Sequence, residues 1–230
     1  MGRLAVAARG LLSVNMSTDA IRPSSPVPKP PAEPQHGPAG ARRGAIVTVR
    51  HGQPDVSRKV LLSAAEYAQW WSRYEETGLK PGQTPPPGLL ATAREAAVVL
   101  SSSRIRAIQT AEAVTEGRGF QIDAALVEAP LPPPRWPAWL RLPPFLWGII
   151  ARFWWWFFNH HEGQESRVQA EARAESVAAR LAGMARDGDV LVVAHGFFNT
   201  MIRRSLRRAG WTIVESQGGL NYWCCRRLER

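Results

Sequence analysis

Cysteine is almost absent from this chain of 230 residues, which contains only Cys224 and Cys225. Neighbouring cysteines rarely bond to each other, so the sequence offers no disulfide framework and no cysteine-based zinc site. We therefore expect the protein to work in a reducing environment, and the cytoplasm is the simplest such compartment.

Acidic residues are also scarce, because 19 Asp and Glu face 29 Lys and Arg and leave a formal net charge of +10. This excess favours anionic partners such as phosphates, nucleic acid or an acidic membrane surface. The basic residues are scattered, however, and the stretch IRRSLRRAG fits one solvated face of a helix. We therefore expect no nucleic-acid partner.

The sequence lacks an apolar run long enough to cross a bilayer. The most apolar stretch, FLWGIIARFWWWFF at residues 145–158, is interrupted by Arg152. As a helix it would be about 21 Å long, against roughly 30 Å of bilayer hydrocarbon. Near the start of the chain, Arg9 interrupts the apolar residues of MGRLAVAARGLLSV, so we expect no secretory signal.

Residues 1–44 differ in composition from the rest of the chain. Their second half, PSSPVPKPPAEPQHGPAGARRG, is rich in proline and poor in large apolar side chains. Such a segment cannot bury enough surface to offset the entropy of ordering, so we predict a disordered tail over residues 1–44. Met16 is an alternative start. The 45% hydrophobic content then supports a single folded domain over residues 45–230.

Within residues 45–230, short apolar runs alternate with helix-like segments. The runs that predict buried strands cover residues 45–49, 96–102 and 189–195. The segments that predict helices cover residues 63–77, 103–114, 164–186 and 197–209. We expect residues 220–228 to supply an edge strand. This alternation predicts an α/β three-layer sandwich, with a central, mostly parallel sheet flanked by helices.

Basic side chains follow these predicted strands directly. Arg50 and His51 end the first, Arg104 and Arg106 follow the second, and His195 ends the last. Ligands of open α/β sheets bind at the carboxyl ends of the strands, so we expect these groups to converge. Guanidinium groups match the geometry of phosphate, and a histidine held beside them stays neutral and nucleophilic. The chemistry indicated is phosphoryl transfer.

Five motifs carry a resemblance to a known family. They are TVRHGQP from Thr48, SSSRIRAIQTAE from Ser101, LVE at Leu126, GQES from Gly163 and VVAHG from Val192. In this order and spacing they resemble the signature of the histidine phosphatase superfamily, also called the phosphoglycerate mutase-like family. RHG alone is a weak pattern, whereas the ordered set is specific.

The resemblance implies a role for each matching residue. His51 would be the nucleophile that forms a phosphohistidine. Arg50 and Arg106 would bind the phosphate oxygens, and His195 would donate to the same group during transfer. Arg104 does not fit the RAxQTA pattern. Glu128 matches the carboxylate that acts as general acid and base.

The sequence departs from the family after Glu128. The family usually continues from this glutamate into a glycine and a Trp-Glu-Gly run, whereas APLPPPRWPAW follows here. Because of this departure, Glu162 and Glu165 are alternative candidates for the general acid. His160 and His161 are adjacent, so their side chains diverge and suit no metal. We expect neither a metal nor another cofactor.

On this basis we predict a phosphomonoester hydrolase. A phosphoglycerate mutase-like phosphotransferase would use the same first step, and a non-catalytic phosphate-binding protein would use the same pocket. The sequence does not show the second set of substrate-anchoring residues that a mutase needs. Retention of both histidines, both arginines and a candidate acid argues against a non-catalytic protein.

The aromatic stretch falls within an insertion at about residues 129–162, where the resembling family covers its active site. Its prolines allow a helix to begin only near Pro144. Three interpretations remain open: a core or a homodimer interface, peripheral contact with an anionic membrane, and a lid for an amphiphilic or lipid-like phosphate. The residues expected to contact substrate or membrane are Trp147, Arg152, Trp154, Trp155 and Trp156.

Overall fold

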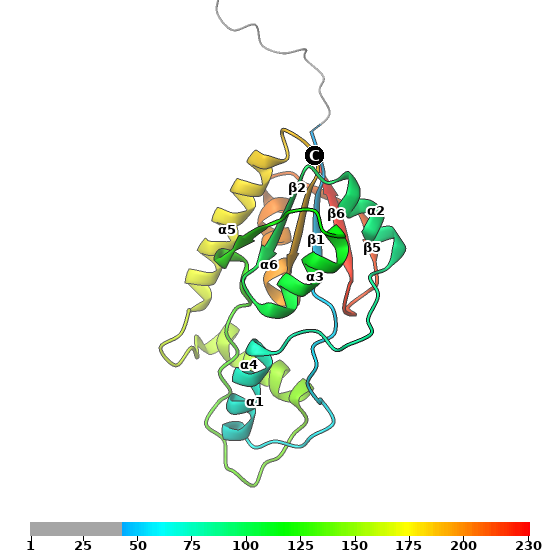
Figure 1. Cartoon of the computed structure of the whole chain (residues 1–230). Coiled ribbons are helices and arrows are strands. Elements are labelled where there is room, and N and C mark those ends of the chain that lie inside the picture. The colour runs from blue at the N-terminus through cyan, green and yellow to red at the C-terminus, as the bar shows by residue number, and fades with distance from the viewer. Residues whose placement is uncertain (1–42) are drawn as a thin grey trace, which may run out of the picture. The chain divides into compact units, whose positions relative to one another are not determined.

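The computed structural model describes residues 43–230, which form one compact unit around a six-stranded sheet (Figure 1). The strand order is β3-β2-β4-β1-β6-β5. The strands are β1 (Ile46–Arg50), β2 (Val98–Ser102), β3 (Gln121–Asp123), β4 (Val190–Ala194), β5 (Thr212–Gln217) and β6 (Cys225–Glu229). The helices are α1 (Ala64–Glu76), α2 (Pro87–Glu95), α3 (Ile105–Thr115), α4 (Pro144–Phe158), α5 (Arg167–Met184) and α6 (Gly196–Arg208).

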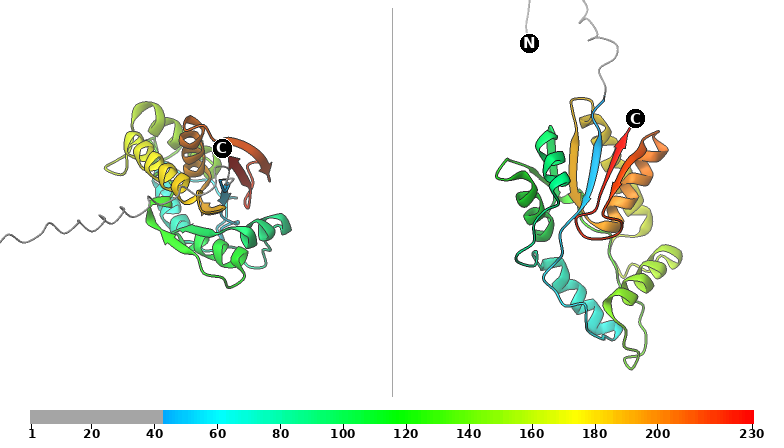
Figure 2. Two further views of the ribbon diagram at one scale, coloured as in Figure 1. Left: turned by 90° about the horizontal axis from the view of Figure 1, so that it is seen from above. Right: turned by 90° about the vertical axis from the view of Figure 1, so that its right-hand side faces the viewer.

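Strands β1 to β4 pair in parallel, whereas β6 runs antiparallel to both β1 and β5. Parallel strands need crossover helices, and these cover both faces of the sheet (Figure 2). The predicted three-layer sandwich with a mostly parallel sheet is therefore confirmed. The predicted tail over residues 1–44 lies outside the described residues except for its last two, and Gly44 donates its N–H to Ala185.

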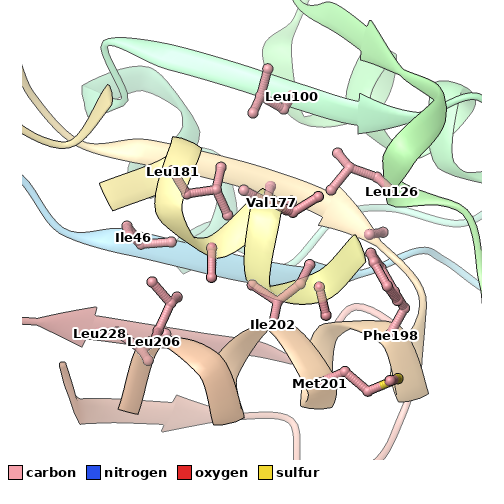
Figure 3. Close-up of a cluster of buried hydrophobic side chains, with 14 of the residues drawn as sticks. Ile46, Leu100, Leu126, Val177, Leu181, Phe198, Met201, Ile202, Leu206 and Leu228 are labelled. Atoms are coloured by element: carbon pink, nitrogen blue, oxygen red, sulfur yellow. The ribbon is translucent and has the colours of Figure 1, made fainter. Parts of the chain in front are cut away.

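Alternate side chains of the central strands pack on opposite faces of the sheet. On one face, Ile46, Val190 and Val192 pack against α5 and α6 (Figure 3). On the other face, Val47 and Leu191 pack against α2 and α3. The β-branched runs thus form strands because both of their faces are buried, which is the pattern that predicted them.

Helices α1 and α4 lie beyond the sheet, at the end toward which the parallel strands run (Figure 1). Ser63 and Glu66 form a capping box at the start of α1, which lies within the helix predicted over residues 63–77. Helix α4 begins at Pro144, as its prolines require, and ends at Phe158, where Asn159 caps it with a left-handed φ of 53°. Together the two helices bury a separate aromatic cluster around Tyr67 and Trp147.

One strand prediction was wrong. Residues 220–228 were expected to form an edge strand, but β6 lies between β1 and β5, and β5 forms the edge. Helix α2 and strands β3 and β5 were missed altogether. Every side chain of β5, TIVESQ, is exposed, so its sequence shows none of the apolar alternation that predicts a strand.

Within residues 43–230, no helix is both long enough and apolar enough to cross a membrane. Helix α4 has only 15 residues and interrupts its apolar surface with Arg152. The expectation from its length and charge therefore agrees with the structure.

Replacing Trp147 by alanine should lower the free energy of unfolding by about 3–5 kcal/mol, because the change leaves a cavity where a fully buried indole stood. It also removes the hydrogen bond from the indole N–H to the Leu62 carbonyl, 2.6 Å away. Trp139, which is 79% exposed, is the matched control. In urea unfolding, Trp139→Ala should change the free energy of unfolding by less than about 0.5 kcal/mol. Equal effects of the two variants would contradict this packing.

Candidate active site

The carboxyl ends of the parallel strands bring His51, Arg106 and His195 together. His51 directly follows β1, His195 directly follows β4, and Arg106 lies in the first turn of α3, which follows β2. All three are buried, with exposures of 2%, 0% and 0%. These three side chains were expected to converge because each follows a strand, and they do lie in one site.

The ring of His51 has one nitrogen available for chemistry. Its Nδ1 lies 2.7 Å from the Gly52 carbonyl oxygen, which can only accept, so Nδ1 carries the proton. Its Nε2 accepts a hydrogen bond from Arg106 Nε at 3.3 Å. The backbone contact therefore selects the tautomer whose Nε2 lone pair faces the guanidinium.

Arg106 is held in place by α1. Its Nη1 donates to the carbonyl oxygens of Tyr74 and Glu75, and its Nη2 forms an ion pair with Glu75 Oε1 at 2.7 Å. Its guanidinium carbon also lies 4.7 Å from the centre of the Tyr74 ring. A buried cation needs such partners, so Glu75 supplies the charge that allows Arg106 to remain in the site.

His195 lies beside His51, with 5.1 Å between the ring centres. Its Nε2 is 2.8 Å from Ser102 Oγ, and its Nδ1 is 3.3 Å from Arg106 Nη2. Arg106 can only donate, so Nδ1 accepts and Nε2 carries the proton in the neutral ring. One guanidinium therefore bridges the two histidines.

Burial lowers the pKa of His51 well below its ordinary value, and the positive charge of Arg106 lowers that pKa further. Burial also lowers the pKa of His195, with further contributions from His51 and Arg106. Both rings are therefore neutral at neutral pH, which leaves the Nε2 lone pair of His51 available as a nucleophile.

Arg50 lies at the entrance to this group. Its Nη1 donates to the Leu220 carbonyl at 2.7 Å, and its guanidinium stacks on Tyr222, 4.6 Å from the ring centre. Its Nε is buried without a hydrogen-bond partner among residues 43–230. Tyr222 also faces His51, with 5.8 Å between the ring centres. Arg50 therefore has a donor available for an anionic ligand.

Glu128 lines the same cavity but is engaged by backbone. Its Oε1 accepts the N–H groups of Phe198 at 2.8 Å and Ala129 at 3.0 Å, and its Oε2 accepts the N–H of Phe197 at 3.1 Å. Phe197 and Phe198 belong to the first turn of α6, so Glu128 satisfies donors that the helix itself leaves free. Both carboxylate oxygens are occupied in this conformation.

The alternative acids lie elsewhere. Glu165 forms a two-pronged ion pair with Arg173, and Glu162 pairs with Arg135. Neither lines the cavity that contains His51. Arg104 is also outside this cavity and pairs with Glu75 Oε2 at 2.8 Å. Within the described part of the chain, no group of three or more His, Cys, Asp or Glu side chains could hold a metal ion.

The site opens into a cavity of about 640 Å³ that is lined by both basic and apolar side chains. The polar lining includes Arg50, His51, Arg58, Arg106, Glu128, Arg152, His195, Arg203 and Arg226. The apolar lining includes Tyr67, Trp70, Trp71, Leu131, Pro144, Phe145, Gly148 and Ile149. Six arginines thus share the cavity with one carboxylate, and α1 and α4 supply most of the apolar wall.

The structure corrects the expected contacts of the aromatic helix. Trp147 and Trp155 are fully buried, so neither reaches substrate or membrane. Trp147 belongs to the α1–α4 cluster and Trp155 to the main core, where its indole N–H donates to the Glu165 carbonyl. Trp154 packs against Trp136, and Trp156 packs against Phe197. The cavity wall is instead formed by smaller residues of the same helix.

Arg152 is the charged residue of α4 that does face the cavity. It donates to the Ala129 and Pro130 carbonyls, and its guanidinium carbon lies 3.8 Å from the centre of the Phe197 ring. Burial lowers its pKa to about 10, partly offset by the nearby charge of Glu128, so it stays protonated at neutral pH. It therefore points into the cavity, so of the two contacts expected for Arg152, substrate and membrane, its position favours substrate.

Sequence reasoning missed Glu75, Tyr222 and Arg58 as parts of this site. Glu75 lies within a correctly predicted helix, but nothing local distinguishes it from Glu76. Arg58 lies over the rings of Tyr74 and Tyr222. Their importance comes from contacts between segments far apart in the chain, which no local pattern reports.

The two histidines should make stability depend on pH. Below about 6.5, the ordinary histidine value, the unfolded chain takes up protons that the folded chain refuses. The stability that depends on the two neutral rings is therefore fully present above about pH 6.5. It is lost as the pH falls toward the lowered pKa values of His51 and His195. The free energy of unfolding should fall by up to about 1.4 kcal/mol per pH unit for each histidine.

Urea unfolding at several pH values between about 5 and 8 measures this slope. His195→Gln should remove about half of it, because one of the two buried rings is gone. A free energy of unfolding that stays constant as the pH drops below neutrality would contradict the buried, neutral rings.

Several solved structures are similar to this chain. YhfR of Bacillus stearothermophilus is 20% identical, with 72% of this chain and 80% of that chain covered and a TM-score of 0.47. A phosphoserine phosphatase of Entamoeba histolytica, solved with phosphoserine, is 14% identical, with 72% and 80% covered and a TM-score of 0.46. A mycobacterial glucosyl-3-phosphoglycerate phosphatase is 24% identical, with 73% and 80% covered and a TM-score of 0.44.

No curated protein matches the chain. The sequence does match the family description of the histidine phosphatase superfamily, branch 1, over residues 46–218, which span most of the chain and all five motifs. The resemblance that the motifs predicted is thereby confirmed, and the chain belongs to branch 1 of the histidine phosphatase superfamily.

Proposed function

We propose that this phosphatase hydrolyses phosphomonoesters through a phosphohistidine on Nε2 of His51. One observation carries the proposal: Nδ1 of His51 is tied to the Gly52 carbonyl, while Nε2 faces the guanidinium of Arg106. A phosphate bound by Arg106 therefore lies next to the nucleophilic nitrogen. Arg50 supports the same arrangement, because its buried Nε has no partner among residues 43–230.

The reaction consists of two displacements. In the first, the Nε2 lone pair forms a bond to phosphorus while the bond to the ester oxygen breaks, and the leaving oxygen takes a proton. In the second, water attacks phosphorus, the bond to Nε2 breaks, and inorganic phosphate leaves with His51 restored. Arg50 and Arg106 stabilise the charge on the phosphoryl oxygens in both steps, and His195 adds its Nε2–H once that group leaves Ser102 Oγ.

Glu128 is the proposed proton donor and acceptor because it is the carboxylate that lines the cavity. Both of its oxygens accept backbone N–H groups in this conformation. Oε1 takes two of these bonds and Oε2 takes one, so releasing Oε2 costs one bond from Phe197. Glu128 would therefore act after turning Oε2 toward the leaving oxygen.

The cavity favours an amphiphilic substrate. The histidines and arginines that surround His51 suit a phosphate, whereas the apolar side chains of α1 and α4 suit an apolar group of the same molecule. A small polar ester such as a sugar phosphate would leave this wall without a partner. We therefore infer that the substrate class is a phosphomonoester with an alkyl, aryl or isoprenoid part.

His51→Asn should abolish turnover, with kcat lowered by about 10⁴-fold or more, because the amide can replace the Nδ1 contact but cannot form the phosphoenzyme. His160 is the matched control, since it lies in the insertion and outside the cavity. His160→Asn should keep kcat within about twofold. Release of inorganic phosphate from a phosphomonoester measures both.

The same assay separates the alternatives. A mutase would isomerise a sugar acid phosphate while releasing almost no inorganic phosphate, and a non-catalytic binding protein would do neither. Either result would refute hydrolysis as the main activity.

The length of the substrate's alkyl chain tests whether the apolar wall of the cavity binds substrate. Across a series of n-alkyl phosphates, kcat/KM should rise by up to about fourfold per added methylene until the wall is covered. Gly148→Leu should remove this rise and leave methyl phosphate almost unaffected, because a side chain at Gly148 enters the cavity beside Tyr67.

Gly183 is the matched control for this substitution. It is also a helical glycine, but no atom lies within 4 Å of the position where its side chain would begin. Gly183→Leu should preserve the dependence on chain length. A kcat/KM that is flat across the series for the unaltered protein would rule out the amphiphilic class without affecting the phosphohistidine step.

A further inference from the structure

Helix α4 presents three different faces around its axis. One face is buried and contains Trp147, Ala151 and Trp155. A second lines the cavity with Phe145, Ile149 and other residues. The third contains Leu146, Phe153 and Phe157, which fall within an arc of about 40° at 3.6 residues per turn. We call this third group the outer stripe.

The outer stripe is apolar and open to solvent. Leu146, Phe153 and Phe157 are 39%, 46% and 67% exposed. Phe158, which is 63% exposed and contacts Phe153, extends the apolar surface at the end of the helix. Large aromatic groups at this exposure indicate a surface that meets a partner.

Basic residues outnumber acidic residues in the sequence around the outer stripe. From residue 129 to residue 161 the sequence contains no Asp or Glu, but it contains Arg135, Arg141 and Arg152. Arg152 is turned into the cavity, whereas Arg135 and Arg141 are 90% and 51% exposed and pair with Glu162 and Glu66. An apolar stripe flanked by arginines complements a surface of apolar chains beneath anionic headgroups.

We infer that the outer stripe docks the protein onto an anionic lipid bilayer, with α4 lying in the interface. The helix has 15 residues, and within the described range no helix is able to span a membrane, so contact is peripheral. A second copy of the chain is the less suitable occupant, because each copy carries a net charge of +10 and would repel the other.

The docking surface is continuous with the cavity. Phe145 and Ile149 line the cavity and are themselves exposed at 66% and 51%. Ile149 and Phe153 are one helical turn apart, so the cavity wall passes directly into the outer stripe. Docking by the stripe therefore turns the cavity opening toward the lipid, from which an amphiphilic phosphate can enter.

Vesicle flotation of the full chain tests the inference. The unaltered protein should bind vesicles of phosphatidylcholine mixed with phosphatidylglycerol, and bind vesicles of phosphatidylcholine alone much more weakly. Phe153→Ser combined with Phe157→Ser should weaken binding to the anionic vesicles by about tenfold or more, because two apolar side chains no longer enter the interface.

The matched control replaces two other exposed apolar residues, Ile122 and Val168, which are 57% and 67% exposed on β3 and α5. Ile122→Ser combined with Val168→Ser should leave vesicle binding unchanged. All variants should hydrolyse a phosphomonoester in solution at the unaltered rate, since none of these residues lines the catalytic cavity. This assay keeps failure of docking distinct from failure of the proposed hydrolysis.

Three results would overturn the inference. The first is undiminished vesicle binding by the Phe153 and Phe157 variant. The second is equal binding of the unaltered protein to neutral and anionic vesicles, which would remove the role of the headgroup charge. The third is a dimer in sedimentation velocity that this variant converts to a monomer, which would assign the stripe to a second copy.

Discussion

A single guanidinium, that of Arg106, contacts both histidines of the site and depends on a carboxylate from outside the sheet. It donates to Nε2 of His51 and lies beside Nδ1 of His195, while Glu75 of α1 neutralises it from the other side. A cation with no exposure to water is stable only with such a partner. The position of α1 and the geometry of the phosphate site are therefore coupled.

The same coupling explains why the substrate wall and the catalytic group form one cavity. Helix α1 supplies Glu75 to the site, and its aromatic residues pack with α4. The insertion that provides α4 thus rests on the element that positions Arg106. In this arrangement α4 separates three tasks by its faces: packing through Trp147 and Trp155, lining the cavity through Ile149 and Arg152, and presenting an apolar surface outside.

Much of the fold could be predicted because its signals are local. Apolar runs bounded by polar residues predict β1, β2 and β4, and the capping box at Ser63 predicts α1. Position after a strand predicts that His51 and His195 converge. The roles of the α4 aromatics could not be predicted, because Trp155 and Phe157 are equally apolar and only tertiary packing decides which is buried. Glu75 was missed for the same reason.

The central claim is that Nε2 of His51 is the atom that bonds to phosphorus, and a crystal structure with orthovanadate tests it most directly. Vanadate adopts the five-coordinate geometry of phosphoryl transfer, so the account predicts a bond between vanadium and His51 Nε2. The vanadate oxygens should contact Arg50, Arg106 and His195. Vanadate bonded to His195 instead, or bound away from both histidines, would contradict the account.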